Sequence, residues 1–180
     1  MSRFPLVAED AVQNPEVAAV YDEIRQELGF GMVPNMFKSM AIRPTLLRTE
    51  WNKFRATVLQ GHLPRTLKEM MGVLISDHHG SEYAKLVHMH GLSAMGTSDA
   101  VLGSLITDFA HCPLPERDKA ILRFGLTAGT APLQLTDADW QTLRDHDLSD
   151  EEIFEVIATA NLFAGVNVYT DSAAVPVDQL

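Results

Sequence analysis

Apolar and polar positions never alternate along this chain over the length of a strand, and the β-branched residues are scattered. A half-buried strand needs such alternation, so the sequence predicts no β-sheet. Residues that start and stop helices recur instead, which predicts an all-α fold of eight or nine helices. We find no internal repeat and no low-complexity tract.

Capping residues, prolines and glycines mark the ends of the predicted helices. Asn14 followed by Pro15 predicts a helix start, and Gly29 predicts its end. Thr136 and Ser149 each have an acidic residue three positions later, which is the spacing of a capping box. After a short helix opened by Val33-Pro34-Asn35, the other predicted helices span about 44–60, 64–77, 81–95, 98–109 and 116–128.

The chain is long enough for one domain with a proper core. We expect a single domain over residues 1–180, with a break at Gly61–Pro64. The N-terminal helices then occupy residues 1–60, the core of the domain 61–172, and a loosely held tail 173–180.

Composition restricts the kinds of partner. The formal net charge is −10, which argues against nucleic acid or an anionic membrane, because phosphate binding needs clustered Lys and Arg. No apolar run reaches the length of a membrane span, and the first ten residues lack the apolar region of a signal peptide. We therefore expect a cytoplasmic protein that acts on a small molecule.

Cys112 is the single cysteine. An intrachain disulfide and a zinc site built from several thiolates are therefore excluded. A two-cysteine redox cycle within one subunit is excluded as well. Pairing of Cys112 between subunits stays open.

One segment concentrates groups that could carry chemistry. Glu69 precedes the apolar run Met70–Ile75, and a carboxylate in such surroundings needs a partner. Histidine is a natural partner, and a Glu–His pair is an acid–base device near neutral pH. Four of the seven histidines fall within thirteen residues of this segment: His78, His79, His88 and His90.

The histidine spacing gives a metal site little support. His88 and His90 point to different faces of one helix, and His78 and His79 are adjacent in a turn. No two histidines of this helix have the i, i+4 spacing of a helical metal pair. A divalent metal held by Glu69, His88 and one of His78 or His79 is kept as an alternative.

The order Glu69, Ser81, Tyr83, Ala84, His88 resembles the alkyl hydroperoxidase D and carboxymuconolactone decarboxylase superfamily. Redox members of that family carry a Glu, a Cys-x-x-Cys pair twelve residues later, and a His four residues after the second Cys. Ser81 and Ala84 stand at the two cysteine positions of this spacing. Tyr83 stands between them, where family members often carry Tyr or His.

Other segments extend the resemblance to the peroxidase-related branch of that family, from about residue 30 to about 170. They are Val33–Phe37 with Arg43-Pro44, Leu63–Glu69, Gly96, Leu148–Ile153 and Asn161–Asn167. The resemblance implies an alkyl hydroperoxidase D-like helical bundle. It also implies a homo-oligomer, which would be a dimer, trimer or hexamer.

The resemblance implies that thiol peroxidase chemistry is lost, because serine is a poor nucleophile and the alanine side chain carries no nucleophilic group. We therefore expect a cofactor-free acid–base enzyme that performs proton transfer, decarboxylation or a lyase-type reaction. His88 would move the proton, Glu69 would orient it, and Tyr83 or Ser81 would donate a hydrogen bond to the substrate.

Structural roles compete with these assignments. Ser81 follows a glycine at a helix start and is therefore a candidate N-cap, and Tyr83 could be a core aromatic residue. Two other functions also stay open. One is a metal-dependent enzyme that uses the His-rich turn, and the other is a non-catalytic binding relative.

Overall fold

The computed structural model describes residues 2–179, and within that range the chain forms nine α-helices and no strand. The predicted all-α class is therefore confirmed. The helices are α1 (Pro15–Leu28), α2 (Asn35–Met40), α3 (Pro44–Phe54), α4 (Arg65–His79), α5 (Glu82–Ala94), α6 (Asp99–Thr107), α7 (Glu116–Thr130), α8 (Asp137–Asp145) and α9 (Asp150–Ser172). Short turns of other helix types lie at Glu9–Ala11, Arg55–Leu59, Phe109–His111 and Pro132–Gln134.

Local capping signals predicted the helix ends well. The Asn14 side chain accepts hydrogen bonds from the backbone N–H groups of Glu16 and Val17, and Gly29 ends α1 with a φ of 87°. Both predicted capping boxes form, at Thr136 and at Ser149. The helix predicted over 44–60 differs, because its last turn, Arg55–Leu59, is a π-helix.

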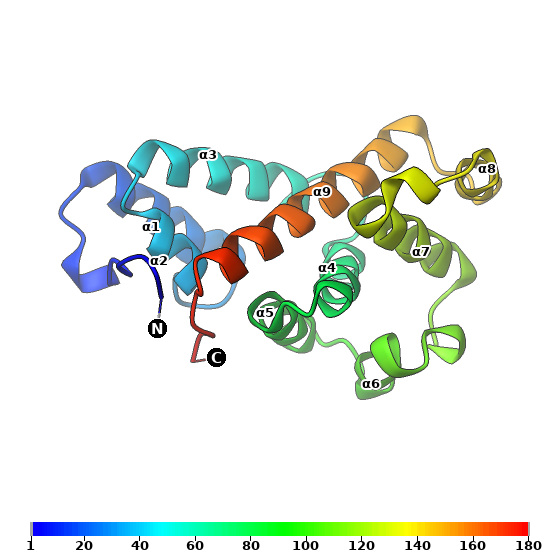
Figure 1. Ribbon diagram of the computed structural model, residues 1–180, viewed down its shortest axis with the longest axis horizontal. Coiled ribbons are helices and arrows are strands. Elements are labelled where there is room, and N and C mark those ends of the chain that lie inside the picture. The colour runs from blue at the N-terminus through cyan, green and yellow to red at the C-terminus, as the bar shows by residue number, and fades with distance from the viewer. Residues whose placement is uncertain (1, 180) are drawn as a thin grey trace.

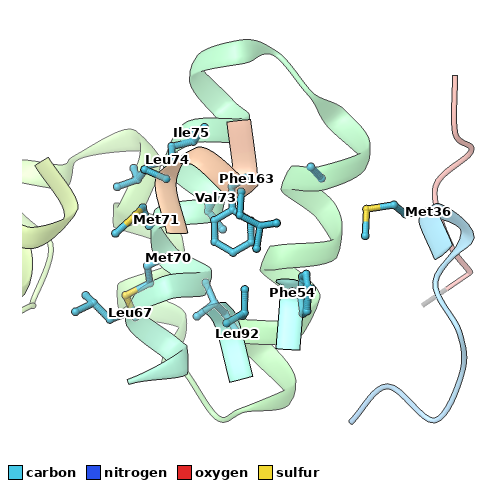
Figure 2. Close-up of a cluster of buried hydrophobic side chains, with 14 of the residues drawn as sticks. Met36, Phe54, Leu67, Met70, Met71, Val73, Leu74, Ile75, Leu92 and Phe163 are labelled. Atoms are coloured by element: carbon cyan, nitrogen blue, oxygen red, sulfur yellow. The ribbon is translucent and has the colours of Figure 1, made fainter. Parts of the chain in front are cut away.

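Helix α4 lies at the centre of the bundle and contacts α5, α7 and α9. Figure 1 shows α1 to α3 at one end of the molecule and α6 to α8 at the other, with α9 running between them. Figure 2 shows Phe163 of α9 beside the apolar face of α4, where Met71 and Ile75 are fully buried.

Two glycines let α7 approach α4 closely. A Cβ at Gly125 would lie 2.5 Å from the sulfur of Met71, and one at Gly129 would lie 2.7 Å from Ile75. Larger side chains at these positions would therefore separate the two helices.

Helix α9 is the one helix within residues 2–179 that is long and apolar enough to cross a membrane. Its apolar character has another explanation, because the helix packs against α4, α5 and α7. Ile153, Val156 and Phe163 are buried in these contacts. A helix that is apolar on most sides is expected at the centre of a bundle.

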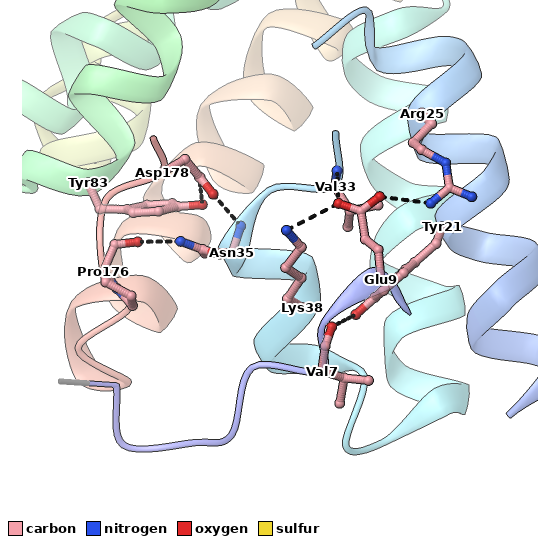
Figure 3. A network of polar contacts seen from close by, with 10 residues as sticks. All are labelled: Val7, Glu9, Tyr21, Arg25, Val33, Asn35, Lys38, Tyr83, Pro176 and Asp178. Carbon is pink, nitrogen blue, oxygen red and sulfur yellow. Dashed lines mark hydrogen bonds and ion pairs between the residues drawn. The ribbon is translucent and has the colours of Figure 1, made fainter. Parts of the chain in front are cut away.

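The expectation of a loose tail is wrong for residues 173–179, while Leu180 lies outside the described residues. Ala173, Val175 and Asp178 are buried. The backbone N–H of Asn35 donates to Asp178 Oδ1 over 2.8 Å, and its side-chain amide donates to the Pro176 carbonyl over 3.1 Å. Figure 3 shows this segment held against the start of α2.

The N-terminal segment is held against α1, α2 and the chain between them. The Glu9 carboxylate accepts from Arg25 over 2.8 Å and from the backbone N–H of Val33 over 3.1 Å, and it pairs with Lys38 at 3.2 Å (Figure 3). These contacts fix the position of α2 and of the chain just before it.

Candidate functional site

Glu69 of α4 and His88 of α5 form a buried pair. His88 Nδ1 lies 2.7 Å from Glu69 Oε2, and the two residues are 5% and 3% exposed. Arg65, one turn earlier on α4, donates to Glu69 Oε1 over 3.2 Å and to the Leu28 carbonyl over 2.9 Å. The site therefore joins α4, α5 and the end of α1.

Opposing effects act on the pKa of Glu69. Burial raises it, but the hydrogen bond and charge of His88 and the charge of Arg65 lower it more. The pKa of Glu69 therefore lies below its ordinary value of 4.5, and the group is a carboxylate at neutral pH. A carboxylate accepts hydrogen bonds only, so Nδ1 of His88 carries the proton in this pair.

Close contacts fix the position of the His88 imidazole. A Cβ at position 72 would lie 2.6 Å from His88 Nε2, so only glycine leaves room for the ring. Phe163 meets the ring with a centroid distance of 4.4 Å and an angle of 72° between planes. The imidazole is therefore held between α4 and α9.

The other nitrogen of His88, Nε2, has no hydrogen-bond partner among residues 2–179. Every fully buried side-chain nitrogen or oxygen in that range has a partner, so Nε2 keeps contact with free space. His88 and Glu69 both line a small cavity. With the proton on Nδ1, Nε2 is therefore the basic nitrogen of a residue that lines the cavity.

Apolar side chains dominate the cavity. The free space is about 30 Å³, which is room for a water molecule. Glu69, Tyr83 and His88 are the polar residues of its lining, which contains no lysine or arginine. The apolar lining residues are Leu28, Phe30, Pro34, Met36, Phe37, Phe54, Ala84, Val87, Phe163 and Val166.

The hydroxyl of Tyr83 is already engaged. It donates to Asp178 Oδ2 over 2.9 Å (Figure 3). It also accepts from the backbone N–H of Met36 over 3.0 Å. Burial and the charge of Asp178 raise the pKa of Tyr83 above its ordinary value. In this arrangement Tyr83 has no free proton for a substrate, in contrast to the donor role expected from the sequence.

Ser81 is engaged too. Its hydroxyl donates to Asp171 Oδ1 over 2.9 Å and makes no capping bond to α5, so the expected N-cap side-chain bond is absent. Ser81 is fully buried and is not part of the cavity lining, whereas Ala84 is. Neither side chain offers the cavity a nucleophile. Cys112 is buried beside Val101, 3.9 Å from that carbonyl, and does not line the cavity.

The remaining histidines lie apart from the Glu69–His88 pair. His78 and His79 are exposed at the end of α4, and His79 Nδ1 accepts from Asn167 over 3.1 Å. His90 contacts the Phe30 ring. Within residues 2–179, no three His, Cys, Asp or Glu side chains come close enough together to hold a metal. The alternative metal set has no geometric support in that range.

Several residues of the site were not predicted from the sequence. Arg65 had a usable signal, because it precedes Glu69 by four residues on one helix and such pairs face each other. No such sequence signal pointed to Phe30, Phe163 or Asp178, because these residues approach the site from distant parts of the chain.

Comparisons with known proteins identify the fold. No protein-family model matches the chain, and the search of curated proteins finds no match. A peroxidase-related protein with an alkylhydroperoxidase AhpD core from Ralstonia eutropha JMP134 is similar over 99% of this chain and 93% of its own, at 24% identity and a TM-score of 0.87. A peroxidase-related protein from Silicibacter sp. TM1040 gives 20% identity, 99% and 92% coverage, and a TM-score of 0.87.

A third solved structure is that of an enzyme. It is a cysteine-to-alanine variant of the debrominase Bmp8 in complex with 2,3,4-tribromopyrrole, with 21% identity and a TM-score of 0.82 over 99% of this chain and 95% of its own. The chain therefore has the AhpD-like all-helical fold, a fold that includes enzymes.

Proposed function

We propose that the chain is a cofactor-free acid–base enzyme that transfers a proton to or from a small organic molecule. The observation that carries this proposal is the buried 2.7 Å contact between His88 Nδ1 and Glu69, two residues that both line the cavity, while Nε2 has no hydrogen-bond partner among residues 2–179. A histidine oriented by a carboxylate is a general base whose basic nitrogen is already positioned.

The proton route follows from the charges. Nε2 takes a proton from the substrate, and the resulting imidazolium is stabilised by the Glu69 carboxylate at Nδ1. The substrate anion is then protonated again by the same Nε2. Together with His88, Arg65 helps to keep Glu69 ionised, so Arg65 is a positioning residue in this scheme.

The lining favours proton transfer over decarboxylation. A carboxylate substrate would lose its hydration without gaining a cationic partner, because the lining has no lysine or arginine. The debrominase that shares the fold was crystallised with a small ring compound, which also supports a small organic substrate.

Proton exchange into a simple ketone tests the proposal. Cyclohexanone incubated with the protein in heavy water should gain deuterium beside its carbonyl faster than in buffer, as followed by mass spectrometry. We expect His88→Ala to lower this excess rate by about 100-fold or more, the usual contribution of a general base. His78→Ala, which removes an exposed histidine of α4, should leave it unchanged. Equal rates for wild type and His88→Ala would refute the role of His88.

A non-catalytic binding relative is the second candidate. The small size of the cavity favours it, because about 30 Å³ does not hold an organic substrate. Exchange no faster than in buffer, for the wild-type protein and for its variants alike, would support this candidate over the enzyme.

A further inference from the structure

The loop between α1 and α2 covers the cavity with one aromatic side chain. Phe30 is half-buried and lines the cavity. Its ring packs on α5, where a Cβ at Gly91 would lie 3.3 Å from the ring, and it meets His90 edge-on with a centroid distance of 5.4 Å. Phe30 therefore separates the Glu69–His88 pair from solvent on this side.

The loop is anchored at both ends, and the backbone between these anchors can change conformation. At one end the Leu28 carbonyl accepts from Arg65, and at the other the Val33 N–H donates to Glu9. Leu28 and Val33 are both buried. Between them Gly29 and Gly31 flank Phe30, with φ values of 87° and 68° that favour glycine. Rotation at these two glycines would move Phe30 and leave both anchors in place.

The size of the cavity requires such a movement for any ligand with a ring. An apolar cavity of about 150 Å³ binds benzene, whereas the free space here is about 30 Å³. Other lining residues, such as Phe37 and Phe163, are almost fully buried within helices. Phe30 is the lining aromatic residue that lies in a loop, and its displacement would enlarge the cavity at least cost.

Charge restricts the ligand further. Glu69 is ionised and already paired with Arg65 and His88, and Asp178 is already paired with Tyr83. An anionic ligand would meet the Glu69 carboxylate and no lysine or arginine of the lining. A neutral ring avoids this desolvation cost.

We propose that Phe30 is the gate of the Glu69–His88 cavity and sets the size of the neutral ring compound that the cavity admits. This assignment rests on the proposed function, since it names the substrate class of the same site. Phe30 acts by occupying the mouth of the cavity, and it takes no part in proton transfer.

Calorimetric binding of three compounds tests the gate. Phenol is a neutral single ring, benzoate is a charged single ring, and 1-naphthol is a neutral double ring. We expect the wild-type protein to bind phenol, and to bind benzoate and 1-naphthol at least tenfold more weakly, which is a common penalty for a misfit in an apolar pocket. Phe30→Ala should bind 1-naphthol at least tenfold more tightly than wild type does and should still discriminate against benzoate.

Two further variants complete the design. Phe154→Ala removes an exposed phenylalanine from α9, outside the cavity lining, and should bind all three compounds as wild type does. Phe30→Leu keeps an apolar side chain, should fold even where Phe30→Ala does not, and should bind 1-naphthol with intermediate affinity. Equal 1-naphthol affinity in wild type and both Phe30 variants would overturn the gate.

The same compounds separate the gate from the chemistry. Binding of benzoate as tight as phenol, or no binding of phenol by wild type or Phe30→Ala, would overturn the assigned substrate class. The Phe30 variants could change the affinity for 1-naphthol as expected while His88→Ala keeps the full rate of proton exchange. This combination would support the gate and refute the proposed catalytic role of His88.

Discussion

Replacing Gly72 by alanine should displace the imidazole ring of His88 directly. The added Cβ would lie 2.6 Å from Nε2, whereas ordinary contact begins near 3.4 Å, so the ring must move by about 0.8 Å, the difference between these distances. Movement away from α4 also carries Nδ1 away from Glu69, which lies on the same helix. The 2.7 Å contact, lengthened by 0.8 Å, reaches about 3.5 Å, where a hydrogen bond is essentially lost.

Two opposing contributions set the magnitude. Loss of a hydrogen bond to a charged group costs about 1.5–3 kcal/mol. Alanine in place of glycine within a helix returns about 1 kcal/mol. We therefore expect the free energy of unfolding to fall by about 0.5–2 kcal/mol, and the melting temperature by about 1–8 °C for a chain of this size.

Thermal and urea unfolding followed by circular dichroism would measure this change. Gly103→Ala is the matched control, because Gly103 lies within α6 and a Cβ there would meet nothing within 4 Å. It should stabilise the protein by up to about 1 kcal/mol. A Gly72→Ala variant as stable as wild type, or stabilised like Gly103→Ala, would show that His88 is not held as described.

Three other variants address charge, the tail and assembly. The pKa of Glu69 lies below 4.5, so its contribution to stability is present above pH 4.5 and disappears as the pH falls through the folded-state pKa. The stability difference between wild type and Glu69→Gln in urea titrations should therefore shrink below pH 4.5, and a constant difference would contradict the pairing. Asp178→Ala leaves the Asn35 N–H and the Tyr83 hydroxyl without their acceptor, which should cost about 1–3 kcal/mol and speed hydrogen exchange in residues 173–179. The exposed apolar face of α9, which includes Phe154 and Val168, is where we expect copies of the chain to associate. Val168→Glu should then reduce the mass measured by light scattering, and an unchanged mass would exclude this face.

Local signals explain why much of the fold was predictable. Asn14, Thr136 and Ser149 act on backbone groups within three residues of themselves, so their effect can be deduced from short windows of sequence. The resemblance on Glu69 and His88 named two residues that lie on adjacent packed helices, α4 and α5, and that contact each other.

Distant partners explain what the sequence did not predict. The Ser81 hydroxyl meets Asp171, 90 residues later, and the Tyr83 hydroxyl meets Asp178, 95 residues later. A capping rule therefore favoured the wrong partner for Ser81. The segment after α9 was expected to be a loose tail, but Ala173, Val175 and Asp178 are buried, and Asp178 accepts hydrogen bonds from distant parts of the chain.

The contact between Asn35 and Asp178 joins positions 143 residues apart, and Tyr83 depends on the same carboxylate. During synthesis the early helices leave the ribosome long before Asp178 does. Tyr83 and the start of α2 therefore remain without this acceptor until residue 178 has been synthesised. One wall of the cavity is finished late in folding, after the helices that carry Glu69 and His88 can already have packed together.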